Sequence, residues 1–144
     1  MKRMCKVLAV ALLLVLAMSS ISYASEWKQD EKGWWYQYDD GSYAQNEWFD
    51  IDQTTYYFNS NGYWVEGAMP LTLENYSKVS SNMTFKEVTA ILGNPTDHVS
   101  HTDIGAGAEY VSDMYYWKSK SGLSISSMIF TGGVLNVKTV SWVD

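Results

Sequence analysis

The region from Glu26 to Met69 constrains the fold most, because nearly all of its large apolar residues are aromatic. It holds thirteen aromatic residues in 44 positions, and Ile51 and Val65 are its main aliphatic residues. A small β-domain usually builds its core from valine, isoleucine and leucine. A chain of this composition must instead pack ring against ring, so we expect short aromatic strands whose rings stack on one another.

The same region repeats itself. When it is shifted by about 20 residues, a spacing found in repeat arrays, Trp35 falls on Thr55 and Tyr36 falls on Tyr56. Each aromatic run is followed by a polar turn of Asp, Asn, Ser and Gly, which is typical of β-hairpins. We therefore predict a short all-β module of aromatic hairpins, of the β-solenoid type, over residues 26–69.

Residues 33–67 resemble the cell-wall-binding repeats of secreted Gram-positive proteins, the choline-binding and glucan-binding group. The segments that carry the resemblance are WFDID at 48–52, TYYFNSNGYW at 55–64 and the closing Gly67, and Thr55 stands where that family usually has tryptophan. The resemblance implies retention at the cell wall through teichoic-acid choline or wall glycan.

Ring faces attract a quaternary ammonium group by about 0.5–2 kcal/mol per contact, and they also stack on sugar rings. From ring type and position we predict a choline or glycan cage formed by Trp35, Trp48 and Tyr57. The alternative is that these rings only pack the module.

Residues 1–24 have the pattern of a signal peptide. A basic start precedes an apolar run at 7–18, and small residues end at Ala24, after which we expect cleavage. The apolar run is shorter than the roughly 20 residues that span a bilayer, although an uncleaved anchor is the alternative. The only cysteine, Cys5, lies in this segment, so disulfide bonds cannot stabilise the mature chain. We expect a secreted protein without a membrane span after cleavage.

The charge of the mature chain is strongly negative. Seven lysines stand against sixteen acidic residues, and residues 26–69 alone carry a net charge of −7. Nucleic acid and anionic lipid need basic surfaces, so we exclude them as partners of this region. The charge is compatible with a cationic ligand.

The pattern of caps, turns and alternating apolar residues in 70–144 predicts a separate α+β domain. Thr84 and Glu87 have the spacing of a capping box, and Gly93 is expected to end the helix that they begin. We therefore predict a helix over 85–92, after a shorter helix at 73–79. Four strands are expected after the helices, at 97–102, 109–118, 124–131 and 134–142. Two helices packed on an antiparallel four-stranded sheet follow from this order.

This domain resembles the β-lactamase-inhibitor-like (BLIP-like) domains of secreted Gram-positive proteins. The matching segments are NMTFKEV at 82–88, ILGNP at 91–95, YWK at 116–118 and FTGGV at 130–134. The resemblance covers residues 75–142 and implies a sheet face that binds another protein.

The strand at 109–118 carries rings on both faces, and only one face can pack on the helices. We predict that Tyr115, Trp117 and Trp142 lie on the open face and form a protein-binding surface. The alternative is that this face packs on the hairpin module.

Catalytic motifs are absent from the sequence. It contains no Gly-x-Ser-x-Gly elbow, phosphate-binding loop or HExxH motif, and no cysteine nucleophile after residue 24. His98 and His101 would point to opposite faces of a regular strand, so we predict no metal site there. We expect no cofactor and no enzyme activity.

The predicted function is that of a secreted, non-catalytic protein associated with the cell wall. The hairpins would hold it on choline or glycan, and the α+β domain would bind an unidentified extracellular protein. The alternatives are a freely secreted inhibitor of an extracellular enzyme and, from another class, a small wall hydrolase.

Overall fold

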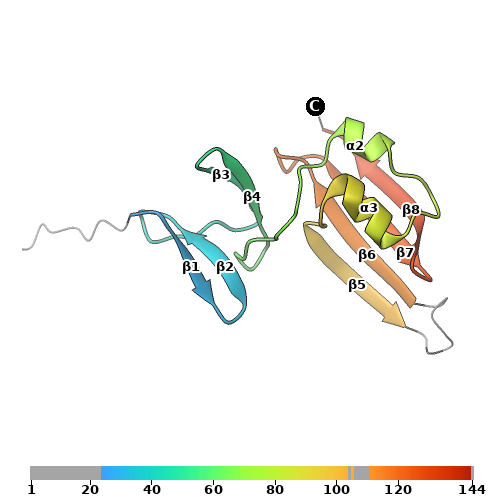
Figure 1. The fold of residues 1–144 in the computed structure, drawn as a ribbon, viewed down its shortest axis with the longest axis horizontal. Coiled ribbons are helices and arrows are strands. Elements are labelled where there is room, and N and C mark those ends of the chain that lie inside the picture. The colour runs from blue at the N-terminus through green and yellow to red at the C-terminus, as the bar shows by residue number, and fades with distance from the viewer. Residues whose placement is uncertain (1–23, 104, 106–110, 144) are drawn as a thin grey trace, which may run out of the picture.

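The structure, a computed structural model, describes residues 24–103, 105 and 111–143. The predicted signal peptide lies outside the described residues, apart from Ala24. The chain forms two parts, a pair of β-hairpins followed by an α+β domain (Figure 1). None of the helices in the described ranges is long and apolar enough to cross a membrane.

The first part contains two antiparallel hairpins. Strand β1 (Glu26–Asp30) pairs with β2 (Gly33–Gln37), and β3 (Glu47–Ile51) pairs with β4 (Thr54–Phe58). Strand β1 precedes the segment on which the predicted repeat was based, so the first hairpin begins earlier than the resemblance at 33–67 suggested.

The two hairpins correspond at a spacing of 21 residues, not 20. Strand β3 begins at Glu47, 21 residues after the start of β1 at Glu26. The turn glycines Gly41 and Gly62 have the same spacing, and each donates its backbone N–H to the carbonyl three residues before it. The predicted alignment was wrong by one residue because consecutive aromatic residues match in either register. The backbone turns decide between the two registers.

Ring packing holds the two hairpins together, as the composition predicted. Ala44, Ile51 and Phe58 are buried at the centre of this part. Six rings from both hairpins pack around them: Trp27, Tyr36, Tyr38, Phe49, Tyr56 and Trp64.

The second part has the predicted α+β architecture. Helices α2 (Leu73–Ser77) and α3 (Phe85–Leu92) precede four antiparallel strands. The strands lie side by side in chain order: β5 (Asp97–Asp103), β6 (Val111–Lys118), β7 (Ile125–Thr131) and β8 (Val134–Ser141). Both helices lie on the same face of the sheet (Figure 1).

The core lies between the helices and the sheet. Val88 and Leu92 of α3 are fully buried against Trp117 of β6, Met128 of β7 and Leu135 of β8. The predicted α3 is confirmed with its bounds. The Thr84 hydroxyl accepts the backbone N–H of Glu87, and the Glu87 carboxylate accepts the N–H of Thr84.

Gly93 ends α3 and also joins the two parts. Its φ of 72° is in the left-handed region, and a Cβ at this position would lie 2.5 Å from the carbonyl oxygen of Gly67. Asn94 donates its backbone N–H to that same oxygen at 2.8 Å. Only glycine therefore lets the end of the hairpin part approach the end of the helix this closely.

Candidate functional site

A cavity of about 290 Å³ opens between the two hairpins and is lined entirely by aromatic residues. Trp27 and Trp34 come from the first hairpin, Tyr56 comes from β4 of the second, and Trp64 comes from the segment that follows β4 and forms a bridge with Phe58. Trp64 donates its backbone N–H to the carbonyl of Trp34 at 2.7 Å, which fixes the two hairpins in this position. We call this the four-ring cavity.

Three rings of the four-ring cavity support one another edge to face. The Trp27 centroid lies 4.9 Å from that of Tyr56 and 6.0 Å from that of Trp64. The fourth ring, Trp34, has no ring partner among the described residues and is 43% exposed. The cavity thus has a floor of three mutually packed rings and one exposed aromatic wall, and none of its lining residues is charged.

The residues predicted to form the cage do not come together. Trp35 lies on the face of β2 opposite Trp34 and lines a different cavity. The ring centroids of Trp48 and Tyr57 are 5.0 Å apart. Tyr57, however, is only 1% exposed and faces the α+β domain. The predicted cage was therefore wrong.

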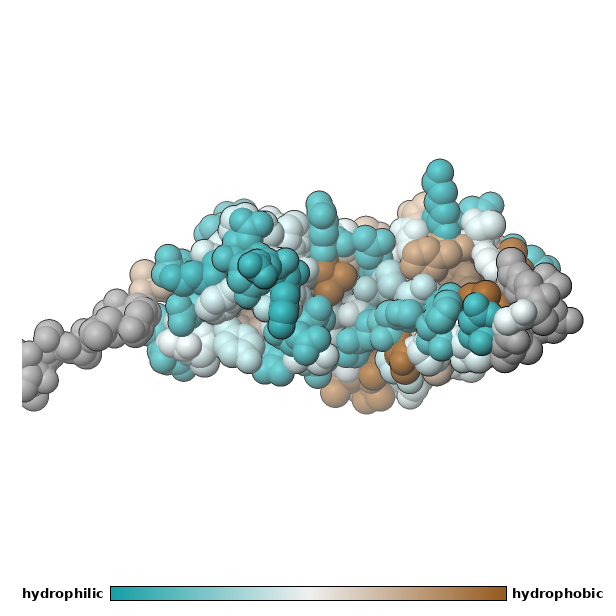
Figure 2. Space-filling model, turned by 90° about the horizontal axis from the view of Figure 1, so that it is seen from below, coloured by the Kyte–Doolittle hydropathy of each residue, from teal (hydrophilic) through white to brown (hydrophobic). Residues whose placement is uncertain are grey.

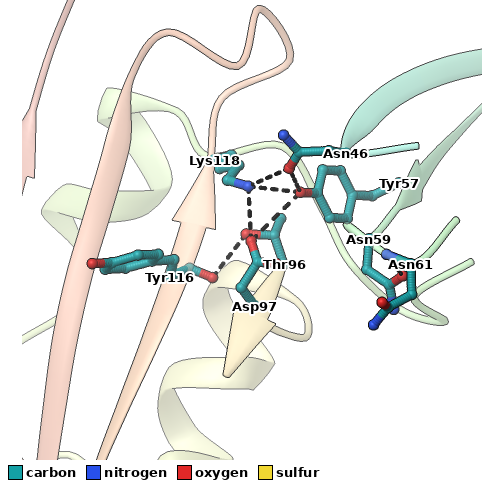
Figure 3. A network of polar contacts seen from close by, with 8 residues as sticks. All are labelled: Asn46, Tyr57, Asn59, Asn61, Thr96, Asp97, Tyr116 and Lys118. Carbon is teal, nitrogen blue, oxygen red and sulfur yellow. Dashed lines mark hydrogen bonds and ion pairs between the residues drawn. The ribbon is translucent and has the colours of Figure 1, made fainter. Parts of the chain in front are cut away.

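The face of the second hairpin that carries Tyr57 packs on the α+β domain through a polar network (Figure 3). The ammonium group of Lys118, at the end of β6, is the centre of this network. It donates to three acceptors that are each 2.8 Å away: the amide oxygen of Asn46, the hydroxyl of Tyr57 and the carboxylate of Asp97. Each of the three N–H groups of the ammonium therefore has an acceptor, so none of its hydrogen-bonding capacity is left unused.

A second ion pair lies on the rim of the same interface. The ammonium of Lys120 contacts the carboxylate of Asp50 at 2.7 Å and the hydroxyl of Thr55 at 3.3 Å. Thr55 corresponds to Trp34 at the 21-residue spacing, so a small polar residue stands where the first hairpin has a ring. This departure from the repeat pattern lets a lysine of the α+β domain approach.

The predicted protein-binding residues lie on the side of the sheet that the helices cover. Trp117 is fully buried, and its indole N–H donates to the carbonyl of Gly93 at 3.0 Å. Tyr115 is half-buried against Phe85 of α3. Trp142 is 38% exposed but contacts Tyr76 of α2. The prediction failed because the largest rings of the sheet pack beneath the helices.

The open face of the sheet is formed by the alternate residues. Met114, Ile129 and Val137 are paired across β6, β7 and β8 and form one apolar row, and Tyr116 lies beside it on β6. These side chains are partly exposed, and Val137 is 43% exposed. Figure 2 shows that the strongly hydrophobic surface residues on the face in view gather mainly over the α+β domain.

The two histidines share a carboxylate. An irregularity in the pairing of β5 between His98 and Ser100 brings both rings to one side of the sheet. The Nε2 atom of His98 and the Nδ1 atom of His101 lie 3.1 and 2.7 Å from the same carboxylate oxygen of Asp113. The prediction that the two rings point to opposite faces was therefore wrong. Burial raises the pKa of the Asp113 carboxyl, but its hydrogen bonds with the histidines outweigh burial and lower it. Across the described part of the chain, no group of three or more potential ligands is placed to hold a metal.

The chain was compared with known proteins by sequence and by structure. No match was found among curated proteins. One solved structure that resembles the chain is the modular Cpl-1 endolysin in complex with a peptidoglycan analogue. The sequence identity is 23%, the match covers 73% of this chain and 28% of that chain, and the TM-score is 0.32. A likeness at this level carries no argument about fold or ligand.

A family model described as beta-lactamase inhibitor (BLIP) matches residues 72–144. The match includes both helices and all four strands of the α+β domain. It covers just over half of the sequence. The chain therefore belongs to the beta-lactamase inhibitor (BLIP) family.

Proposed function

We propose that this chain is an exported, non-catalytic protein of the cell wall with two binding surfaces. The hairpins bind teichoic-acid choline or wall glycan, and the α+β domain binds another protein. The observation that carries the proposal is the four-ring cavity, because four aromatic side chains from two hairpins surround one space.

The chemistry of the four-ring cavity fits a trimethylammonium group or the apolar face of a sugar. Each cation–π contact contributes about 0.5–2 kcal/mol. Four such contacts contribute at most about 8 kcal/mol, and the loss of ligand freedom removes at least about 4 kcal/mol of this, so we expect a dissociation constant no tighter than about 1 mM. A single site of this strength holds a protein only where the ligand is dense, as it is on a repeating wall polymer.

The proposed protein-binding surface is the apolar row of Met114, Ile129 and Val137 with Tyr116. It replaces the surface predicted from Tyr115, Trp117 and Trp142, since those residues lie on the side of the helices. The proposal rests on two points. The row is partly exposed, with Val137 at 43%, and the family's name describes inhibitors of an enzyme.

Wall attachment is tested by sedimenting the chain from Ser25 onward with purified Gram-positive walls. We expect the wild-type chain to sediment and excess choline to release it. Trp34→Ala should lose retention, because it removes the exposed wall of the four-ring cavity. Trp142→Ala is the matched control, since this tryptophan is similarly exposed but belongs to the other part. Retention that requires Trp34 but resists choline would identify glycan as the ligand. No retention would contradict the proposal.

A freely secreted inhibitor is the second candidate, and the family match favours it. It is tested by adding the chain to a purified β-lactamase and following hydrolysis of a chromogenic substrate. Inhibition that is lost in Met114→Glu, together with no retention on walls, would support the inhibitor. Retention on walls without inhibition of the enzyme would exclude it.

A further inference from the structure

The hairpin part contains a second cavity that shares no lining residue with the four-ring cavity. Its volume is about 230 Å³. It is lined by residues from the end of β1, from β2 and from the turns after β2 and β4: Asp30, Trp35, Tyr43, Asn61, Gly62 and Tyr63. We call it the acidic cavity, because a carboxylate forms part of its wall.

The aromatic wall of the acidic cavity is held in place by its surroundings. The ring centroids of Trp35 and Tyr43 are 6.1 Å apart, with the rings nearly perpendicular. The ring of Tyr43 packs closely against Gly62, where a Cβ would be 2.6 Å from a ring carbon. Gly62 also has a φ of 83°. A glycine is therefore required both by the turn and by the position of this ring.

The carboxylate of Asp30 is equally well fixed. One oxygen accepts the backbone N–H groups of Lys32 and Gly33 at 2.8 and 3.2 Å, and the other accepts the hydroxyl of Tyr63 at 2.9 Å. The hydrogen bond from Lys32 is the main cause that lowers the pKa of this carboxyl. A carboxylate has about four acceptor positions. Three are occupied within the protein, and one remains for a ligand.

We propose that the acidic cavity binds a primary ammonium group, which donates a hydrogen bond to Asp30 while the carbon atoms beside it contact Trp35 and Tyr43. A quaternary ammonium cannot donate such a bond, so this ligand differs from the one proposed for the four-ring cavity. The net charge of −7 on residues 26–69 favours a cation of either kind. The ammonium could belong to an aminoacyl ester on a polymer or to a lysine side chain of a peptide.

The test is an NMR titration of the ¹⁵N-labelled chain from Ser25 onward, with the indole N–H of Trp35 as the reporter. Two probes represent the two sources: alanine methyl ester for an aminoacyl ester, and Nα-acetyl-lysine amide for a peptide. We expect at least one probe to shift the Trp35 signal. Tetramethylammonium, which has no N–H donor, should shift it much less at the same concentration.

Asp30→Asn should weaken binding of the effective probe by at least about tenfold, because a hydrogen bond between charged groups is worth about 1.5–3 kcal/mol and about 1.4 kcal/mol corresponds to a factor of ten. Asp40→Asn is the matched control. Asp40 also accepts hydrogen bonds in a turn, from Ser42, but it does not line the acidic cavity. Its substitution should leave the titration unchanged.

The probe that binds more tightly identifies the source of the ammonium. The proposal is overturned if neither probe shifts Trp35, or if Asp30→Asn and Asp40→Asn behave alike. Failure here is distinct from failure of the proposed wall attachment. Trp34→Ala should abolish the response to choline and leave the response of Trp35 to the probes intact.

Discussion

Lys118→Ala should weaken the contact between the two parts of the chain and lower the stability of the fold, because this side chain bridges them. Its ammonium bridges Asn46 and Tyr57 of the hairpins and Asp97 of the sheet. Its side chain is 15% exposed, and that of Asp97 is 22% exposed. The substitution leaves a largely buried carboxylate and a buried phenol without their shared donor.

The expected loss lies between two limits. Breaking a fully buried pair costs about 3–5 kcal/mol, whereas an exposed pair is worth about 0.2–1 kcal/mol. Because some water reaches both charges, we expect Lys118→Ala to lower the free energy of unfolding by about 2–3 kcal/mol. Lys120→Ala is the control within the same interface. Lys120 and Asp50 are both 54% exposed, so its effect should stay below about 1 kcal/mol.

The assay is urea unfolding at equilibrium, followed by tryptophan fluorescence. A shift of the midpoint by Lys118→Ala well beyond that of Lys120→Ala is expected. Burial lowers the pKa of Lys118, but hydrogen bonds with Asp97 and Tyr57 outweigh burial and raise it above the ordinary lysine value. Its contribution should therefore be complete at neutral pH and disappear as the pH rises through this raised pKa. Equal effects of the two substitutions at neutral pH would refute the role assigned to Lys118.

Three further predictions concern the α+β domain. Trp117→Ala should lower the free energy of unfolding by about 3–5 kcal/mol, because it leaves a large cavity in the core, and urea unfolding measures this. Thr84→Ala should cost about 1 kcal/mol by removing the N-cap of α3, and Thr84→Ser should restore most of the loss. Asp113, bound by His98 and His101, has a lowered pKa, so it stabilises the fold above its unfolded pKa and this contribution is lost as the pH falls through the folded value. Asp113→Asn should therefore flatten the acid side of a plot of melting temperature against pH, and an unchanged acid side would contradict the pairing.

Features that depend on neighbouring residues in the chain were predicted well. The capping box of Thr84 and Glu87 fixes the start of α3, and Gly93 fixes its end, so the helix has the predicted bounds. The order of helices and strands follows from such local patterns. The composition of residues 26–69 likewise predicted that rings, rather than aliphatic side chains, would hold the hairpins together.

Features that depend on packing between distant residues were predicted poorly. Alternation along β6 separates its two faces, but only the position of the helices decides that Trp117 is buried. A pairing irregularity beside His98 reversed the direction expected for one histidine ring. The cage prediction missed all four rings of the four-ring cavity, because their approach depends on how the two hairpins pack on each other and not on the spacing of the repeat.

The most direct test of the account is a choline titration of the ¹⁵N-labelled chain, followed through its tryptophan indole N–H signals. We expect the signals of Trp34 and Trp64 to shift together, with a dissociation constant of about 1 mM or weaker, while those of Trp117 and Trp142 remain in place. A soluble peptidoglycan fragment is the second titrant, because glycan is the alternative ligand of the same cavity. If neither titrant shifts Trp34 and Trp64, the four-ring cavity is not a wall-binding site and its rings serve only to pack the hairpins.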